Sequence, residues 1–240
     1  MTTPALAQNV RGKGRHYQHP KTGELLPSVT NVIGVLNKPA LPRWSAKMVA
    51  EQAAAMKTSL PNLEDAEIVD MLKGAPWRKS GRAADRGTTV HAYLEARLQG
   101  LEPKEISGEA ARFRKAADAF LDEWTPEPLH LEMTVFGDGY AGTGDLWAVL
   151  NNGAVAVLDY KTSKAIYPEA ALQLAALAHA TLDPDGNPIP ATDEAWVIRI
   201  GEDGYEAKQV ADLDYNYQAF MAALQLWHWV NGEKVYEPAA

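Results

Sequence analysis

The chain has 240 residues, of which 46% are hydrophobic, and a formal net charge of −8. It can bury a large core, and its acidity argues against a surface coated for non-specific nucleic-acid binding. The absence of cysteine excludes disulfides, thiolate zinc sites, iron–sulfur clusters and cysteine nucleophiles, so oxygen and imidazole must hold any metal. No apolar run predicts a membrane span or a secretory signal, and we expect a cytoplasmic protein.

Charge is unevenly distributed along the chain. Residues 1–100 contain 14 Lys and Arg against 8 Asp and Glu, whereas residues 101–240 contain 9 against 23. This difference favours one face for an anionic partner and another with clustered carboxylates. Compositional drift explains it equally well.

The first 15 residues are predicted to be a flexible basic tail, because Arg11, Lys13 and Arg15 alternate with Gly12 and Gly14. Beyond them, Ser28 precedes an apolar stripe with helical spacing and suits a helix N-cap. Its backbone amides could alternatively hold a phosphate.

The region from residue 28 to residue 124 reads as helical, with further helices over about residues 42–57, 63–72, 78–99 and 108–124. Gly87 lies one turn before His91 in one of these helices. Glycine inside a helix costs about 1 kcal/mol relative to alanine and indicates close approach of another element. A lone histidine at the margin of an apolar stripe is more often structural than a ligand, so His91 by itself does not indicate a site.

From about residue 129 the pattern alternates, which predicts strands over residues 129–136, 143–150 and 155–161. Asn151-Asn152-Gly153 is a turn that joins the last two strands into a hairpin. A buried helix over residues 169–181, strands over residues 194–200 and 205–210, and a helix over residues 214–230 follow. The fold class is therefore α/β or α+β, with a central mixed sheet flanked by helices and a helical N-terminal region.

The hairpin carries acids at one end. Asp145 lies near the start of the first arm, and Asp159 and Lys161 lie at the end of the second. Asp159 and Lys161 face the same side, whereas Tyr160 faces away and can offer its backbone carbonyl. Two carboxylates and an ammonium held together suit a divalent metal and the activation of water. An isolated Asp-x-Lys is more often an ordinary ion pair at a strand end.

Two other polar residues accompany these acids. Glu132 is embedded in the strand before the hairpin, where a solvent-facing carboxylate and a role beside a metal are about equally expected. Gln173 is the polar exception in a nearly apolar helix, and a buried amide needs hydrogen-bonding partners. We expect Gln173 to face the acidic end of the hairpin.

These motifs together resemble the PD-(D/E)XK nuclease superfamily, in particular its RecB-like, phage-type branch. The resemblance spans roughly residues 17–229 and also includes Pro-Ser-Val-Thr at residues 27–30 and Lys-Pro-Ala-Leu-x-x-Trp at residues 38–44. The motifs that carry it are Arg-Gly-Thr-x-x-His ending at His91, Gly-Thr-Gly-Asp ending at Asp145, Asp-Tyr-Lys-Thr beginning at Asp159, and Gln173.

The resemblance implies a restriction-endonuclease-like core over residues 129–230, beside the helical region 28–124, in one nuclease domain over residues 16–240. It also implies hydrolysis of DNA phosphodiesters by an exonuclease of recombination, repair or phage DNA metabolism. DNA would be bound without sequence preference, a recombination or replication protein is a further partner of this class, and no membrane is involved.

The resemblance also assigns roles to single residues. His91, Asp145, Asp159 and the Tyr160 carbonyl would bind one or two Mg²⁺ or Mn²⁺ ions. Lys161 would position or activate the attacking water with a lowered pKa, and Gln173 would orient Lys161 or contact DNA. Glu132 matches a catalytic position less securely. DNA contacts are expected from Arg82, Arg86, Ser28 and Thr30.

Two departures from the family pattern are visible. The chain lacks the cysteines that hold an iron–sulfur cluster in some RecB-like relatives, so no such cofactor is expected. Leu177 occupies a position where a tyrosine is common, which removes one expected DNA contact.

Two other classes of function remain open at this point. One is a catalytically silent DNA-binding or protein-interaction module on a nuclease fold. The other is a calcium-dependent structural or sugar-binding protein, which would account for the acids but not for Lys161. Joint retention of Asp145, Asp159 and Lys161 favours an active enzyme.

Overall fold

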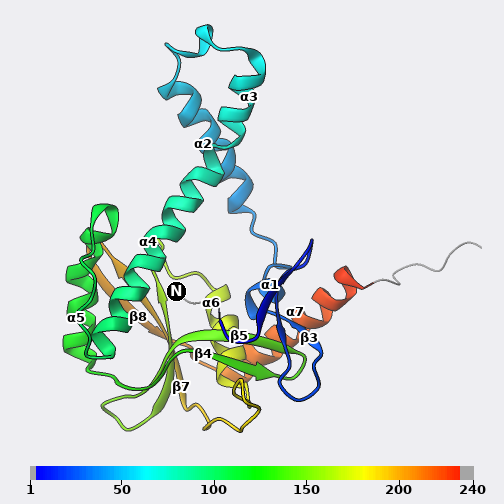
Figure 1. The fold of residues 1–240 in the computed structure, drawn as a ribbon, viewed down its shortest axis with the longest axis vertical. Helices are drawn as coiled ribbons and strands as arrows, with labels where there is room; N and C mark the ends of the chain where they lie inside the picture. The colour runs from blue at the N-terminus through cyan, green and yellow to red at the C-terminus, as the bar shows by residue number, and fades with distance from the viewer. Residues whose placement is uncertain (1–3, 233–240) are drawn as a thin grey trace, which may run out of the picture.

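The structure is a computed structural model that describes residues 4–232. A five-stranded mixed sheet with the order β4-β5-β6-β7-β8 lies at its centre (Figure 1). The strands are β4 (Glu127–Gly137), β5 (Tyr140–Val149), β6 (Val155–Lys161), β7 (Glu194–Gly201) and β8 (Gly204–Gln209). The β6–β7 pair is parallel and the other pairs are antiparallel, because helix α6 (Glu169–Ala178) forms the crossover between β6 and β7. The predicted mixed α/β class is confirmed.

Helices cover both faces of this sheet. Helices α4 (Ala75–Leu98) and α5 (Arg114–Trp124), joined through the 3₁₀ helix η2 (Gly108–Phe113), pack on one face. Helices α6, α7 (Leu213–Asn231) and α1 (Val29–Ile33) form the layer on the other face. Consecutive strand residues point to opposite faces of the sheet. Leu158 therefore lies in the core beneath α4 and α5, and Val157 in the core beneath α6, α7 and α1.

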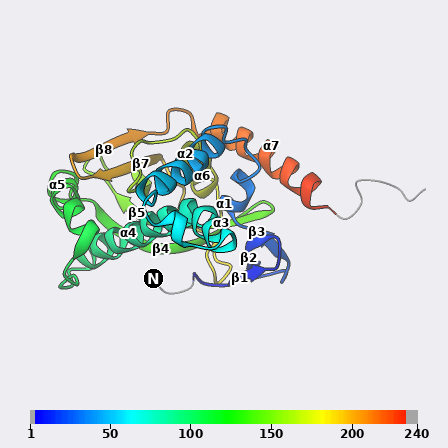
Figure 2. The ribbon, with the colours of Figure 1, turned by 90° about the horizontal axis from the view of Figure 1, so that it is seen from above.

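Helices α2 (Ala40–Ala55), α3 (Asp65–Lys73) and the N-terminal half of α4 stand away from the sheet (Figure 1). We call residues 40–87 the arm; they include the 3₁₀ helix η1 (Leu60–Asn62). Seen from above, α2 and α3 overlie the remainder of the molecule (Figure 2). Neither α2 nor α3 has a fully buried side chain. Helix α4 begins three residues earlier than predicted, since Pro76 fits a first helical turn.

The N-terminal segment differs from the prediction. Strands β1 (Ala7–Val10), β2 (Gly14–Gln18) and β3 (Leu25–Pro27) form a separate three-stranded sheet, so the flexible tail expected over residues 1–15 is wrong for residues 7–15. Gly12 and Gly14 have φ of 78° and 74°, which lets them make the tight turn of this hairpin. Residues 1–3 lie outside the described residues.

The central hairpin forms as predicted. Gly153, with φ of 83°, lies in the turn between β5 and β6, and their pairing extends from Val149 with Val155 to Leu146 with Leu158. The strands after it and the closing helix are also where the pattern predicts them. Within residues 4–232, no helix has the length and apolar character required to cross a membrane.

Candidate metal centre

Three acidic residues form a row across β4, β5 and β6. Leu131 pairs with Leu146 and Met133 with Gly144, so the intervening Glu132 lies opposite Asp145. Leu146 pairs with Leu158 at the end of the β5–β6 ladder, and Asp145 and Asp159 each lie one residue beyond this pair. Residues directly opposite in antiparallel strands share a face of the sheet. Strand register therefore gathers carboxylates that are separated in the sequence.

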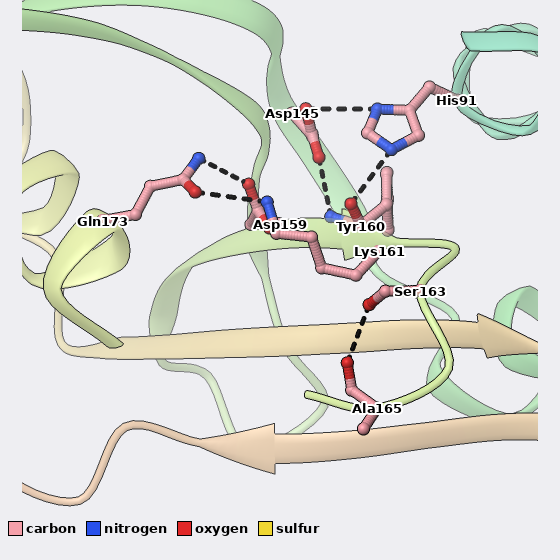
Figure 3. A network of polar contacts seen from close by, with 8 residues as sticks. All are labelled: His91, Asp145, Asp159, Tyr160, Lys161, Ser163, Ala165 and Gln173. Atoms are coloured by element: carbon pink, nitrogen blue, oxygen red, sulfur yellow. Dashed lines mark hydrogen bonds and ion pairs between the residues drawn. The ribbon is translucent and has the colours of Figure 1, made fainter. Parts of the chain in front are cut away.

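His91 reaches this row from helix α4 (Figure 3). Its Nδ1 lies 3.4 Å from Asp145 Oδ1 and its Nε2 lies 3.0 Å from the carbonyl oxygen of Tyr160. The second carboxylate oxygen of Asp145 accepts a hydrogen bond of 2.6 Å from the Tyr160 backbone amide. Because both imidazole nitrogens face acceptors, the metal-free site favours the protonated ring. Burial lowers the pKa of His91, but the charge of Asp145, the hydrogen bond to it and the charge of Asp159 together outweigh burial and raise the pKa to about 9.

Three side chains at this place are grouped so that they could hold a metal ion. One ligand atom from each of His91, Glu132 and Asp145 lies within 4.8 Å of the others. An imidazole nitrogen and two carboxylate oxygens are ligands that suit Mn²⁺ and, through the oxygens, Mg²⁺. The donor set therefore fits a divalent cation, and it includes Glu132, the residue that the sequence motif supports least.

Glu132 has an unusual backbone conformation, and its neighbours raise the pKa of its carboxyl. Its φ of 48° lies in the left-handed region, which a residue other than glycine adopts at a cost in free energy. Burial and the charge of Asp145 raise the pKa of the Glu132 carboxyl to about 7. Two carboxyl groups held against each other in this way are arranged for a cation between them.

Lys161, Asp159 and Gln173 form a second group beside the first (Figure 3). Lys161 Nζ lies 2.5 Å from Asp159 Oδ2 and donates to Gln173 Oε1 at 3.2 Å. Gln173 Nε2 donates to Asp159 Oδ1 at 2.8 Å. The amide thus accepts from the ammonium and donates to the carboxylate, which fixes all three side chains. The expected orientation of Gln173 toward the acidic hairpin is observed.

The protonation of Lys161 differs from the expectation. Burial lowers the pKa of Lys161, but the charges of Asp159 and Asp145 outweigh burial, so its pKa is raised rather than lowered. Asp159 is 3% exposed, and burial raises the pKa of its carboxyl. The expectation of a lowered lysine pKa assumed cations beside it, whereas carboxylates surround it in this structure.

The close approach predicted at Gly87 is present. A Cβ atom at this position would lie 3.3 Å from Thr162 Oγ1, in the segment that follows β6. In the same segment, Ser163 Oγ donates to the carbonyl of Ala165 at 2.7 Å (Figure 3). Gly87 thereby lets α4 approach the end of β6, which places His91 over Tyr160.

The residues expected to contact DNA are more dispersed. Ser28 is buried and its hydroxyl accepts from the Asn31 amide at 3.1 Å, as a helix cap, while it also lies 3.0 Å from the hydroxyl of Thr30. Arg86 lies 3.7 Å from Glu109 and over the ring of Phe113. Arg82 is exposed, nine residues before His91, about two and a half turns away on the opposite side of α4. The structure does not bring Arg82 and Arg86 to the row of acids.

Three hydroxyl groups behind the site lie within hydrogen-bonding distance of one another in a row, and the sequence patterns do not predict this contact. Tyr17 Oη lies 3.1 Å from Thr143 Oγ1, which lies 3.2 Å from Thr134 Oγ1. Thr143 precedes Asp145 by two residues and shares its face, so the N-terminal sheet supports the strand that carries Asp145. In the sequence, the one hint of this contact is the alternation of residues around Tyr17, after Gly12 and Gly14.

Leu177 has a packing role. Its side chain is buried, and a Cβ atom built on Gly142 would lie 2.8 Å from it. Leucine at this position therefore fills the space above the glycines of the Gly-Thr-Gly-Asp motif.

Comparisons with known proteins give limited information. No protein-family model matches the chain, and no curated protein matches it. Among solved structures, SSO0001 has a TM-score of 0.31 and 12% identity, with 48% of this chain and 57% of that chain covered. An alkaline exonuclease (LHK-Exo) from Laribacter hongkongensis has a TM-score of 0.32 and 13% identity, covering 62% of this chain and 84% of that one. Its complex with dAMP has a TM-score of 0.28 and 14% identity, covering 61% and 89%.

These TM-scores and identities do not establish membership of a family.

Proposed function

We propose that the chain is a Mg²⁺- or Mn²⁺-dependent deoxyribonuclease that hydrolyses phosphodiester bonds and acts from DNA ends. The observation that carries this proposal is the adjacency of two groups of side chains. The first is the ligand cluster of His91, Glu132 and Asp145, and the second is the Lys161–Asp159–Gln173 network.

The two groups match the needs of the reaction. Phosphodiester hydrolysis requires a nucleophilic water and stabilisation of the charge that develops on the phosphate. A divalent cation held by His91, Glu132 and Asp145, with the Tyr160 carbonyl and Asp159 close by, would supply a polarised water and a Lewis acid. Lys161, held by Asp159 and Gln173, presents an ammonium that would orient this water or neutralise a phosphate oxygen.

The network around Lys161 favours an enzyme over the other two classes. A structural calcium site gains nothing from an ammonium beside its carboxylates, because the positive charge opposes the cation. A silent DNA-binding module would have no need to keep a buried carboxylate, an ammonium and an amide in one fixed arrangement. We therefore infer that Asp145, Asp159, Lys161, Gln173 and Glu132 are the catalytic residues, and that the DNA backbone binds beside them.

Labelled DNA tests the proposal directly. End-labelled linear and internally labelled circular substrates, single- and double-stranded, are incubated with Mg²⁺, Mn²⁺ or EDTA. We expect degradation of linear DNA with either cation and none in EDTA. Circular DNA should persist, and cleavage of circles as fast as linear DNA would contradict action from ends.

Substitutions separate catalysis from folding. Lys161→Ala and Asp145→Ala should lower cleavage by at least about a hundredfold, because a positioned proton-transfer or charge-stabilising group contributes roughly that much. Lys208→Ala is the matched control, since Lys208 lies on β8 and pairs with Glu206. Circular dichroism verifies that each variant is folded. Undiminished cleavage by Lys161→Ala and Asp145→Ala would refute the assignment.

A further inference from the structure

Trp77 is the most exposed large hydrophobic side chain among residues 4–232, with 77% of its surface accessible. It lies in the first turn of α4, in the arm. An indole exposed to this extent gains nothing from the core, and exposed aromatic side chains mark contact surfaces.

Trp77 and His91 share one side of the same helix. They are fourteen residues apart in α4, which is nearly four complete turns at 3.6 residues per turn and about 21 Å along the axis. A ligand bound beside His91 that continues along α4 toward the arm therefore meets Trp77. The exposed side chains on this side between them are small, namely Ser80, Ala84 and Thr88.

Basic residues flank Trp77 although the protein is acidic. The arm contains eight Lys and Arg against six Asp and Glu, while the whole chain has a net charge of −8. Arg78 and Lys79 follow Trp77 directly and are exposed. Positive charge beside an exposed aromatic ring is the combination that binds single-stranded nucleic acid, since the backbone is anionic and the bases offer flat faces.

We propose that Trp77 is a stacking site for a base of single-stranded DNA, several nucleotides away from the phosphate at the metal centre. A strand must cover this separation of about 21 Å, which requires several nucleotides. A duplex cannot use Trp77 in this way, because its base faces are already stacked. This inference rests on the proposed nuclease function, which supplies the DNA substrate.

Equilibrium binding in EDTA tests the stacking site without cleavage. The probes are a fluorescently labelled twelve-nucleotide oligothymidine strand and a twelve-base-pair duplex, followed by anisotropy. Trp77→Ala should raise the Kd of the single strand roughly fivefold to a hundredfold, the effect of removing one aromatic stacking partner. Trp77→Phe should retain most of the affinity, and the Kd of the duplex should change little.

Trp229→Ala is the matched control, because Trp229 is 61% exposed but lies on α7, outside the arm. An unchanged Kd for Trp77→Ala, or an equal loss for Trp229→Ala, would overturn the inference. A shift of Trp77→Ala to a smaller species in sedimentation, with DNA affinity intact, would also overturn it and identify Trp77 as a protein contact.

Cleavage supplies a second readout that depends on substrate length. Trp77→Ala should lower kcat/KM for a twenty-nucleotide strand and leave that for a dinucleotide unchanged, since the dinucleotide cannot span from the metal centre to Trp77. Equal effects on both strands would contradict the proposed spacing. If wild-type protein binds the single strand through Trp77 and never cleaves it, the nuclease assignment fails while the stacking site stands.

Discussion

Glu132 lies opposite Asp145 across the β4–β5 pairing, with its backbone in the left-handed region at φ of 48°. The two carboxyl groups face one another beside His91, and burial and the charge of Asp145 raise the pKa of Glu132 to about 7. The metal-free site therefore contains unfavourable contacts that a bound cation would relieve.

Replacement of Glu132 by glutamine tests this relation. Glu132→Gln should stabilise the metal-free protein at pH 8 by roughly 0.2–1 kcal/mol, the usual cost of like charges directly opposite in a sheet. The same variant should lose much of the increase in melting temperature that Mn²⁺ gives the wild type, because a ligand to the cation is gone.

Thermal unfolding in EDTA and in Mn²⁺ measures both effects. Glu127→Gln, at the exposed start of β4, is the control with the same change of charge. A full Mn²⁺ stabilisation of Glu132→Gln would exclude Glu132 as a ligand.

The stability of the metal-free protein should fall as pH rises. Glu132 and His91 both have raised pKa values in the folded state, about 7 against an ordinary 4.5 and about 9 against an ordinary 6.5. The folded state therefore binds these protons more tightly than the unfolded state. The stability that protonation of Glu132 provides is complete below pH 4.5 and is lost as the pH rises through 7. The stability that protonation of His91 provides is complete below pH 6.5 and is lost as the pH rises through 9.

Urea unfolding in EDTA across this range measures the decline. His91→Gln should remove the part between pH 6.5 and 9, whereas His228→Gln, at an exposed position of α7, should not. A stability that stays constant or rises from pH 5 to pH 9 in wild-type protein would argue against both pKa shifts.

Gln173 should be needed for catalysis and not for metal binding. Gln173→Glu replaces the amide that donates to Asp159 with a carboxylate that repels it, so the position of Lys161 is no longer fixed. We expect cleavage to fall about 10- to 100-fold, as for other residues that orient a catalytic group, while Mn²⁺ affinity stays near the wild-type value.

Calorimetric Mn²⁺ titration and single-turnover cleavage provide the two readouts. Gln225→Glu, exposed on α7, controls for the added negative charge. A parallel loss of metal affinity and cleavage in Gln173→Glu would place Gln173 in the metal site itself.

Two glycines should respond to alanine with opposite signs. A Cβ atom on Gly144 would overlap the ring of Trp147, so Gly144→Ala should cost about 1–3 kcal/mol. Gly81 lies inside α4 with nothing within 4 Å of such an atom, so Gly81→Ala should stabilise the protein by up to about 1 kcal/mol. Chemical denaturation measures both, and the same sign for both variants would be evidence against the packing around Gly144.

Local patterns predicted most of the secondary structure. The β5–β6 hairpin is encoded by its alternation and by a glycine that adopts positive φ in the turn. The N-terminal sheet escaped prediction because its strands are only three to five residues long, and the same glycines that suggest a tail also form its turn. Its stabilising contacts, such as Tyr17 against Phe136, join residues more than a hundred positions apart.

The sequence by itself determined that Asp145, Asp159 and Lys161 meet at one end of a hairpin, because strand alternation and a tight turn are local properties. The tertiary structure alone decided that Glu132 lies with His91 and Asp145. It also decided that Asp159 contacts Lys161 and Gln173, and that Arg82 and Arg86 lie away from the row of acids. These outcomes depend on strand register and on how α4 and α6 pack across the sheet. Both are set by contacts between segments far apart in the chain, which no local pattern contains.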